Sequence, residues 1–529
     1  MEILGKQFIE GKRVAESEAG FFSHDAATGK PLPYEFFAAT DAEISRAAAA
    51  AAAAFPVYRN TGLEERAAFL DAIAEEIDAL DDTFIGSVMQ ETGLPEQRIR
   101  GERQRTSNQL RLFAAVVRRG DFLGVRIDTA LPDRQPLPRP DIRQYRISIG
   151  PVAVFGAGNF PLAFSVAGGD TASALAAGCP VVVKAHSGHP VTSELVACAV
   201  ARAVERCGIH QGVFGMLFGD NVGGPLVTCP EIKAVGFTGS LRGGRALSEI
   251  AASRSEPIPV FAEMSSVNPV ILFTGALREK GRTIAAGLAA SATLGAGQFC
   301  TKPGLVICIE GEPFDRFCRM LTAEMAGRPA AVMYNRSILR NYHDGINKLS
   351  HIPGMEMLAG EMVEGDRAAA CLFRAPPELL RSPARPLENE VFGPVTVLVT
   401  VKDLRELLEI LPALKGHLAA SLFAADSELS AVRPVVETMA TLVGRVILND
   451  FPTGVEVCDA MMHGGPYPAT SDSRSTSVGT LAVDRFLRPV CYQSYPDHML
   501  PAPLQDSNPY GLLRLVNGRW SAAPLGLPG

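Results

Sequence analysis

Hydrophobic and polar positions between about residues 40 and 118 favour helices. The Ala-rich run 47–54 comes after Thr40-Asp-Ala-Glu43, which has the form of a helix capping box. This run is far too short to cross a bilayer, so we expect a packed surface helix. Further helices are expected at 64–80 and 95–118, and the segment 121–140, rich in Pro, Asp and Arg, is expected to form an extended arm.

After residue 150 the pattern changes to short apolar runs, each followed by a helix-like segment. Strands are expected at 152–155, 180–183, 234–237, 269–273, 304–309, 395–401 and 445–449. Such alternation is typical of parallel sheets with crossover helices, and it predicts an α/β fold. The tail after Met461 is rich in Pro, Ser and Gly, so we expect it to be ordered by docking onto the rest of the chain.

Length and charge narrow the class of protein. A chain of 529 residues is too long for one ordinary core, and 47% hydrophobic residues are enough for two or three domains. The net charge is −7 and no basic run stands out, which argues against a nucleic-acid partner. The first residues carry Lys and Glu, and no uncharged apolar stretch reaches the length of a membrane span, so we expect a cytoplasmic protein without a membrane partner.

The ten cysteines show no C-x-x-C pair and no histidine at zinc spacing. We therefore predict no metal site and reduced thiols, most of them inert core residues.

Six short segments point to one family. They are Phe155-Gly-Ala-Gly-Asn-Phe-Pro-Leu162, Val181-Val-Val-Lys-Ala-His-Ser187, Phe237-Thr-Gly-Ser240, Glu263-Met-Ser-Ser-Val-Asn-Pro269, Gly297-Gln-Phe-Cys-Thr-Lys-Pro-Gly304 and Glu390-Val-Phe-Gly-Pro394. In this order and spacing they resemble the aldehyde dehydrogenase superfamily over nearly the whole chain. The resemblance implies an NAD(P)-binding domain at 1–120 and 141–262 and a catalytic domain at 263–460. It also implies an oligomerisation extension and tail at 121–140 and 461–529, and a homodimer or homotetramer.

Cys300 is the predicted nucleophile. The reaction needs a group that adds to an aldehyde to form an adduct. The adduct must then release hydride and leave a thioester that water cleaves, and a thiolate meets these needs. Cys300 follows the flexible Gly295-Ala-Gly297, where its own backbone N–H is expected to face the developing oxyanion. Without the flanking motif, a buried structural thiol would be the simpler interpretation.

Two further catalytic residues are implied by the resemblance. Asn159 lies in a turn after a strand, where its amide is expected to donate a second hydrogen bond to the oxyanion. Glu263 ends a strand-like segment and is the expected base for the deacylating water, with a pKa raised toward neutrality by partial burial. The Gly-Ala-Gly before Asn159 and the pair Ser265-Ser266 depart from the residues usual in the family, which indicates a distinct branch.

The expected cofactor site lacks a standard G-x-G-x-x-G fingerprint. Instead, the amides of a helix N-terminus are expected to hold a pyrophosphate, and the family assigns riboses to a Lys and a Glu, with a Phe beside the nicotinamide. The corresponding residues here are Gly239, Ser240, Gly244, Lys184, Glu390 and Phe392. Ser187 stands where NAD-preferring relatives often carry a Glu, so we predict a preference for NADP, with NAD possible.

The predicted substrate is a small aldehyde. The segment 464–479 resembles the branch that contains dehydrogenases of 2-oxoglutarate semialdehyde (2,5-dioxopentanoate), and a related branch oxidises fatty aldehydes. Arg105, on a predicted helix, is expected near the tunnel mouth, where it would pair with the far carboxylate unless it is one of several solvated arginines. The same fold would also suit a CoA-acylating enzyme, which would not depend on Glu263. A non-catalytic homologue would be expected first to lose Cys300, Asn159, Glu263 or Lys184, and all four are present.

Overall fold

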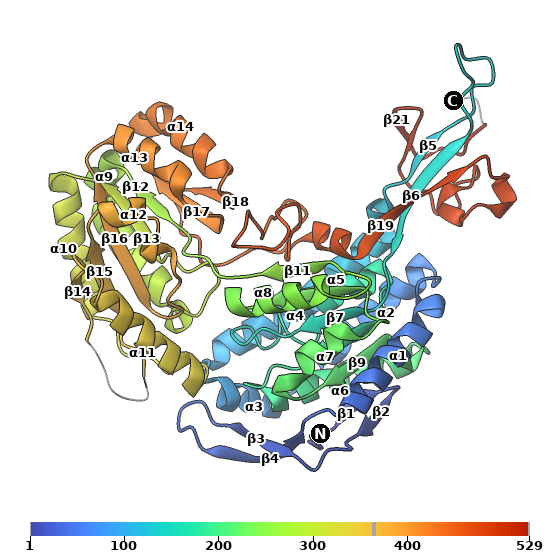
Figure 1. Ribbon diagram of the computed structural model, residues 1–529, viewed down its shortest axis with the longest axis horizontal. Coiled ribbons are helices and arrows are strands. Elements are labelled where there is room, and N and C mark those ends of the chain that lie inside the picture. Colours follow the sequence, from blue (N-terminus) through green and yellow to red (C-terminus); the bar gives the residue numbers. More distant parts are fainter. Residues whose placement is uncertain (1, 362–366, 527–529) are drawn as a thin grey trace.

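The structure is a computed structural model that describes residues 2–361 and 367–526. Two α/β halves lie side by side, and a small sheet projects from the first half, as Figure 1 shows. The α/β fold class predicted from the sequence is confirmed. No helix in the described residues is long and apolar enough to cross a membrane.

The first half is built on a seven-stranded sheet whose first five strands are parallel. Its order is β11 (Val260–Glu263), β10 (Ala234–Thr238), β7 (Val152–Phe155), β8 (Val181–Lys184), β9 (Phe214–Leu217), β1 (Gln7–Ile9) and β2 (Lys12–Val14). The helices of this half are α1 (Asp41–Tyr58), α2 (Leu63–Asp78), α3 (Asp82–Thr92), α4 (Glu96–Arg119), α5 (Gly169–Ala177), α6 (Pro190–Arg206), α7 (Gly223–Thr228) and α8 (Leu241–Ala252).

The predicted capping box at the start of α1 is confirmed. The Thr40 hydroxyl accepts a hydrogen bond from the Glu43 backbone N–H at 3.2 Å, and the Glu43 carboxylate accepts one from the Thr40 N–H at 2.8 Å. The alanines that face inward along α1 are buried, as expected for a packed helix.

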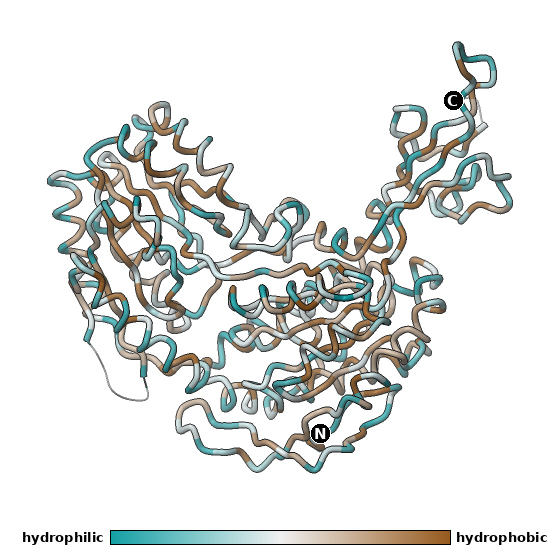
Figure 2. The backbone as a smooth tube through the Cα atoms, viewed as in Figure 1, coloured by the Kyte–Doolittle hydropathy of each residue, from teal (hydrophilic) through white to brown (hydrophobic). Residues whose placement is uncertain are grey.

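The second half holds another seven-stranded sheet, in which only the edge pair β14–β15 is antiparallel among the described strands. Its order is β14 (Glu356–Ala359), β15 (Cys371–Ala375), β16 (Val395–Val401), β13 (Leu305–Ile309), β12 (Val270–Leu272), β17 (His417–Phe423) and β18 (Val443–Leu448). Its helices are α9 (Thr274–Thr293), α10 (Glu312–Ala326), α11 (Arg336–Ser350), α12 (Glu378–Arg381), α13 (Leu404–Ile410) and α14 (Leu429–Ala440). Figure 2 shows apolar residues concentrated along the strands of this half.

The projecting sheet has five strands. Its order is β19 (Leu487–Gln493), β6 (Ile142–Ser148), β5 (Arg126–Asp128), β20 (Arg514–Val516) and β21 (Arg519–Ser521). β6 follows the predicted arm at 121–140 and belongs to this sheet, while the domain boundaries implied by the resemblance stay predictions. A separate hairpin is formed by β3 (Gly20–His24) and β4 (Pro31–Phe37).

The segment after Met461 returns to the first half before it enters the projecting sheet. Its backbone bridges to the end of β11, where Glu263 pairs with Thr470 and the Met264 N–H donates to the Ala469 carbonyl. This docking, which the composition of the tail predicted, places the tail beside the junction of the two halves.

Candidate active site

Cys300 lies in a turn between α9 and β13, and the surrounding backbone fixes its position. Gly297 has φ +65°, and a Cβ on it would lie 2.3 Å from the Gly393 carbonyl group, so only glycine fits there. Behind the turn, the Asn268 amide donates to the carbonyls of Cys300 and Lys302 at 2.8 and 2.9 Å. The nucleophile predicted from the sequence therefore stands on a turn that is held by hydrogen bonds and close backbone packing.

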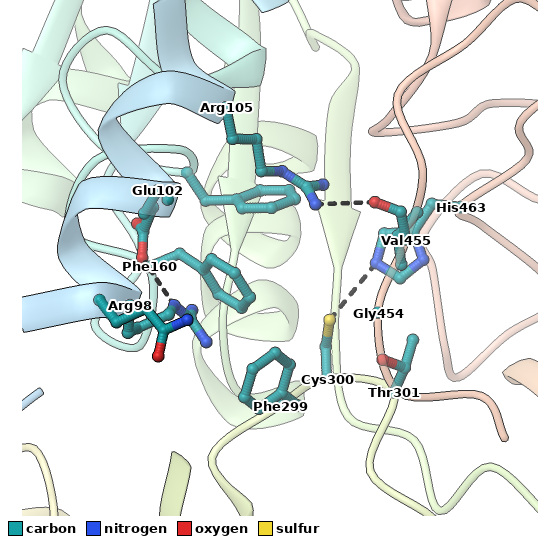
Figure 3. Close-up of a pocket in the computed structure, with 13 residues that line it drawn as sticks. Arg98, Glu102, Arg105, Phe160, Phe299, Cys300, Thr301, Gly454, Val455 and His463 are labelled. Atoms are coloured by element: carbon teal, nitrogen blue, oxygen red, sulfur yellow. Dashed lines mark hydrogen bonds and ion pairs between the residues drawn. The ribbon is translucent and has the colours of Figure 1, made fainter. Parts of the chain in front are cut away.

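A histidine joins the thiol to the predicted base. His463 Nε2 lies 3.4 Å from Cys300 Sγ and 2.8 Å from Glu263 Oε1. Glu263 is the last residue of β11, and its other oxygen accepts a short hydrogen bond from the Ser477 hydroxyl. Figure 3 shows His463 reaching toward the sulfur from the C-terminal segment.

This environment shifts the pKa values of the two predicted catalytic groups. Burial, and then the neighbouring Glu263 carboxylate, raise the pKa of the Cys300 thiol well above its ordinary value. Burial alone would raise the pKa of Glu263 as well, but the interactions with His463 and Ser477 outweigh it and the pKa is lowered. The expectation of a Glu263 pKa raised toward neutrality was therefore wrong, because it omitted these two partners.

Cys300 lines two cavities. One has a volume of about 260 Å³ and is bounded by α4, the rings of three phenylalanines and the loop at 454–455. The other, of about 770 Å³, lies between the two halves and also receives Asn159, Glu263 and Glu390. Among the described lining residues, Cys300 is the one shared by both cavities.

The larger cavity gathers part of the predicted cofactor set. Gly239, Ser240, Glu390 and Phe392 line it, together with His186. Ser240 caps α8, since its hydroxyl accepts from the Gly243 N–H at 3.1 Å, so the N-terminus of this helix opens on the cavity.

Three other predicted cofactor residues are outside the described lining of this cavity. Lys184 ends β8, and burial lowers its pKa, an effect that Asp220 partly offsets. Ser187 is exposed in the loop before α6. Gly244 packs so tightly that a Cβ there would lie 2.6 Å from the Met264 sulfur, which gives it a packing role.

Asn159 stands beside the nucleophile. Its amide donates to the Gln298 carbonyl at 3.0 Å, which fixes the side chain near Cys300 and leaves a second N–H for another acceptor. Nearby, Lys302 is buried, donates to the Val391 and Val395 carbonyls, and is electrostatically linked to Glu390. Burial lowers the pKa of Lys302 and raises that of Glu390.

The smaller cavity is lined by Arg105, which the sequence analysis expected near the tunnel mouth, and also by Arg98, which the sequence motifs did not single out. Both come from α4, seven residues apart, and residues two turns apart lie on one helix face, so the spacing could have revealed the pair. His463 was also missed, although it immediately precedes the segment 464–479 that indicated the branch.

The sulfur, the His463 imidazole and the Glu263 carboxylate lie within 4.8 Å of one another. A soft thiolate, an imidazole and a carboxylate are ligands that Zn²⁺ accepts. The three groups that form the candidate catalytic centre are therefore also able to hold a divalent metal.

Comparison with known proteins identifies the family. The model of the aldehyde dehydrogenase family matches residues 14–467, and the chain belongs to this family. It is 50% identical to the alpha-ketoglutaric semialdehyde dehydrogenase of Acinetobacter baylyi over 518 residues, covering 97% of this chain and 98% of that one. It is also 50% identical to alpha-ketoglutaric semialdehyde dehydrogenase 2 of Azospirillum brasilense over 525 residues, covering 98% of this chain and all of that one.

Solved structures share the fold. An NADP-dependent glyceraldehyde-3-phosphate dehydrogenase from Bacillus halodurans, complexed with NADP, aligns with a TM-score of 0.79 at 20% identity and covers 93% of this chain and 99% of that one. A 1-pyrroline-5-carboxylate dehydrogenase from Thermus with bound NAD aligns with a TM-score of 0.77 at 20% identity, with 92% of each chain covered.

Proposed function

We propose that this aldehyde dehydrogenase oxidises 2-oxoglutarate semialdehyde to 2-oxoglutarate with NADP. The observation that carries the proposal is that Cys300 lies where a cavity with two guanidinium groups meets a larger cavity at a helix N-terminus. The cavity with the two guanidinium groups suits an aldehyde that carries a carboxylate, and the larger cavity at the helix N-terminus suits a dinucleotide. The 50% identity to two enzymes named for this substrate supports the same conclusion.

In this proposal Cys300 forms a thiohemiacetal and then a thioester. Asn159 and the backbone N–H of Cys300 hold the oxyanion, and His463 Nε2 passes the thiol proton toward Glu263, since it contacts both atoms. Once this proton has left to solvent, Glu263, whose lowered pKa favours the carboxylate at neutral pH, takes a proton from the water that cleaves the thioester. Bound NADP would supply the two-electron acceptor, held by the α8 N-terminus, Glu390 and Phe392.

A substrate panel tests the proposal. We expect kcat/KM for 2-oxoglutarate semialdehyde to exceed that for pentanal and decanal by at least about tenfold, the worth of one charge-assisted hydrogen bond. Arg105→Ala should for the same reason raise the KM for the semialdehyde far more than for pentanal. A wild-type preference for decanal would favour the fatty-aldehyde alternative, against which the charged lining of a 260 Å³ cavity argues.

The NADP preference rests on Ser187, which can donate to a phosphate where a Glu would repel it, and on the cationic Lys184 nearby. Measured side by side, kcat/KM should be higher with NADP than with NAD, and Ser187→Glu should reverse the order. Equal or better efficiency of the wild type with NAD would contradict this part of the proposal.

The proposal includes a homodimer or homotetramer in the cytoplasm. Edge strands β19 and β21 of the projecting sheet and β18 of the second half offer unpaired backbone groups, which proteins commonly cover. The free cysteines suit a reducing compartment. Light scattering coupled to size-exclusion chromatography should give a mass at least twice that of the 56.2 kDa chain.

A further inference from the structure

Helix α4 brings two arginines to the substrate side of Cys300. Arg98 and Arg105 both line the 260 Å³ cavity, together with Phe160 and Phe299, as Figure 3 shows. Another arginine of this helix, Arg100, pairs instead with Asp82 and Glu96 at the surface.

The Arg98 guanidinium is held between rings and is incompletely bonded. Its central carbon lies 4.3 Å from the centre of the Phe160 ring and 4.6 Å from that of Phe299, and its Nε lies 3.2 Å from a Glu102 oxygen. Its Nη2 is buried without a hydrogen-bond partner among the described residues.

The Arg105 guanidinium is also incompletely hydrogen-bonded. Its Nη1 donates to the Val455 carbonyl at 2.7 Å, while its Nε is buried and also lacks a partner within the described chain. Both arginines line the cavity and each has a buried N–H without an acceptor, which is costly, so a carboxylate that enters the cavity would be favoured beside the two guanidinium groups.

Among the described residues that line the cavity, basic groups outnumber acidic ones, although Glu456, beside the lining residue Val455, also interacts with Arg105. Glu102 is the acidic residue of its described lining, and its other oxygen already accepts from the N–H groups of Leu162 and Ala163 at 2.9 and 3.0 Å. Two guanidinium groups against one carboxylate leave one excess positive charge, which matches a monoanionic substrate.

We propose that Arg98 is a second specificity-determining residue, which together with Arg105 binds the 2-oxo carboxylate end of the substrate. This inference rests on the proposed function and extends it. The 2-oxo acid end offers three acceptor oxygens, and the two unpartnered N–H groups come from opposite ends of the cavity-facing stretch of α4. An aldehyde of equal length without the carboxylate leaves both groups unsatisfied.

Kinetics on matched variants test the inference. Arg98→Met keeps the bulk between the two rings but removes the charge, and we expect it to raise KM for 2-oxoglutarate semialdehyde by about 10- to 100-fold. KM for pentanal should change less than about threefold, because pentanal has no carboxylate for Arg98 to bind. Arg98→Lys, which keeps the charge without the planar fork, should fall between. Arg100→Met, on the solvent side of the same helix, should behave as wild type.

A binding measurement removes the dependence on turnover. In a Cys300→Ala background, calorimetry should show that Arg98→Met weakens binding of the product 2-oxoglutarate by about tenfold or more, while Arg100→Met does not. Equal effects of Arg98→Met on both aldehydes, or unchanged 2-oxoglutarate affinity, would overturn the inference.

A wrong substrate assignment gives a different result from a wrong role for Arg98. If the wild type oxidises 2-oxoglutarate semialdehyde no better than pentanal, the proposed substrate is wrong, and succinate semialdehyde against butanal then tests Arg98 as a carboxylate-binding residue. Loss of that discrimination in Arg98→Met would support the role of Arg98, and its persistence would refute it.

Discussion

The thiol of Cys300, the imidazole of His463 and the carboxylate of Glu263 lie in one cluster, in which His463 Nε2 is 3.4 Å from the sulfur and 2.8 Å from a Glu263 oxygen. Within it, the carboxylate is favoured as an anion and the thiol as a neutral group. The nucleophile is therefore held mostly protonated at neutral pH, and its proton must leave before or during attack on the aldehyde.

Replacing the nucleophile separates chemistry from binding. Cys300→Ala should abolish aldehyde oxidation, because the lost thiol is the group that forms the covalent bond. Cofactor affinity, measured by calorimetry, should stay close to that of the wild type, since one side chain of a 770 Å³ cavity changes. Retention of more than a few per cent of the activity would contradict the role of Cys300.

Glu263→Gln should have two opposite effects. The variant should give a first burst of NADPH in rapid mixing and then turn over slowly, because the water lacks its base. At the same time the Cys300 pKa should fall, since Glu263 raises it, so thiolate is present at lower pH. Alkylation of Cys300 by iodoacetamide at neutral pH, followed by peptide mass spectrometry, should be faster than in wild type. Unchanged turnover would argue against Glu263 as the base for the water, and slower alkylation would argue against its effect on the Cys300 pKa.

Zinc should inhibit the enzyme reversibly. The ligand atoms of Cys300, His463 and Glu263 lie close enough to share one Zn²⁺, and a metal there would occupy the nucleophile. Activity should return on addition of EDTA, and His463→Phe should need at least about tenfold more Zn²⁺ for the same inhibition. Identical inhibition of the variant would show that zinc acts at another site, such as the exposed Cys491.

Local motifs identified the residues that carry a family signature, but not their partners. Cys300, Glu263 and Asn159 are recognisable from their immediate neighbours, and the structure brings all three to one cavity. His463 lies 163 residues from Cys300 in the sequence. Arg98 belongs to no motif and reaches the cavity because it lies on the inner face of α4. Such contacts depend on how the halves pack, which periodicity does not reveal.

At the scale of one helix, the capping box of α1 gives a measurable contribution to stability. Thr40→Ala leaves the Glu43 N–H without its acceptor and should cost about 1 kcal/mol, with a fall in melting temperature of about 2 °C or less for so large a chain. Thr40→Ser keeps the hydroxyl and should be nearly neutral. If calorimetry showed equal losses in both variants, the methyl group would matter instead of the hydroxyl.

The elements themselves were unevenly predictable. Apolar β-branched runs identified β12, β13 and β16 close to their observed bounds. β17 was not among the predicted strands, because His-Leu-Ala-Ala-Ser has the composition of a helix and becomes a strand only between β12 and β18. The short β1 also depends on a distant partner, since Phe8 pairs with Met216.

For the whole molecule, the single tryptophan is a natural reporter of assembly. Trp520 lies on the edge strand β21 and is 62% exposed, and Leu513 and Met499 of the tail are also exposed. If the projecting sheet forms the oligomer interface, Trp520 emission should shift to shorter wavelengths as concentration rises through the dissociation range. An oligomer by light scattering with unshifted emission would place the interface elsewhere.

Because the described walls of the two cavities share Cys300 alone, and the α4 residues line only the smaller one, the α4 face can change without replacing any residue that lines the larger cavity. Over evolutionary time, gene duplicates are then free to exchange residues on the inner face of α4 and acquire new aldehydes while inheriting an intact nucleotide site. The same separation should let an engineer graft the α4 face of one relative onto another and transfer substrate choice without re-optimising the coenzyme.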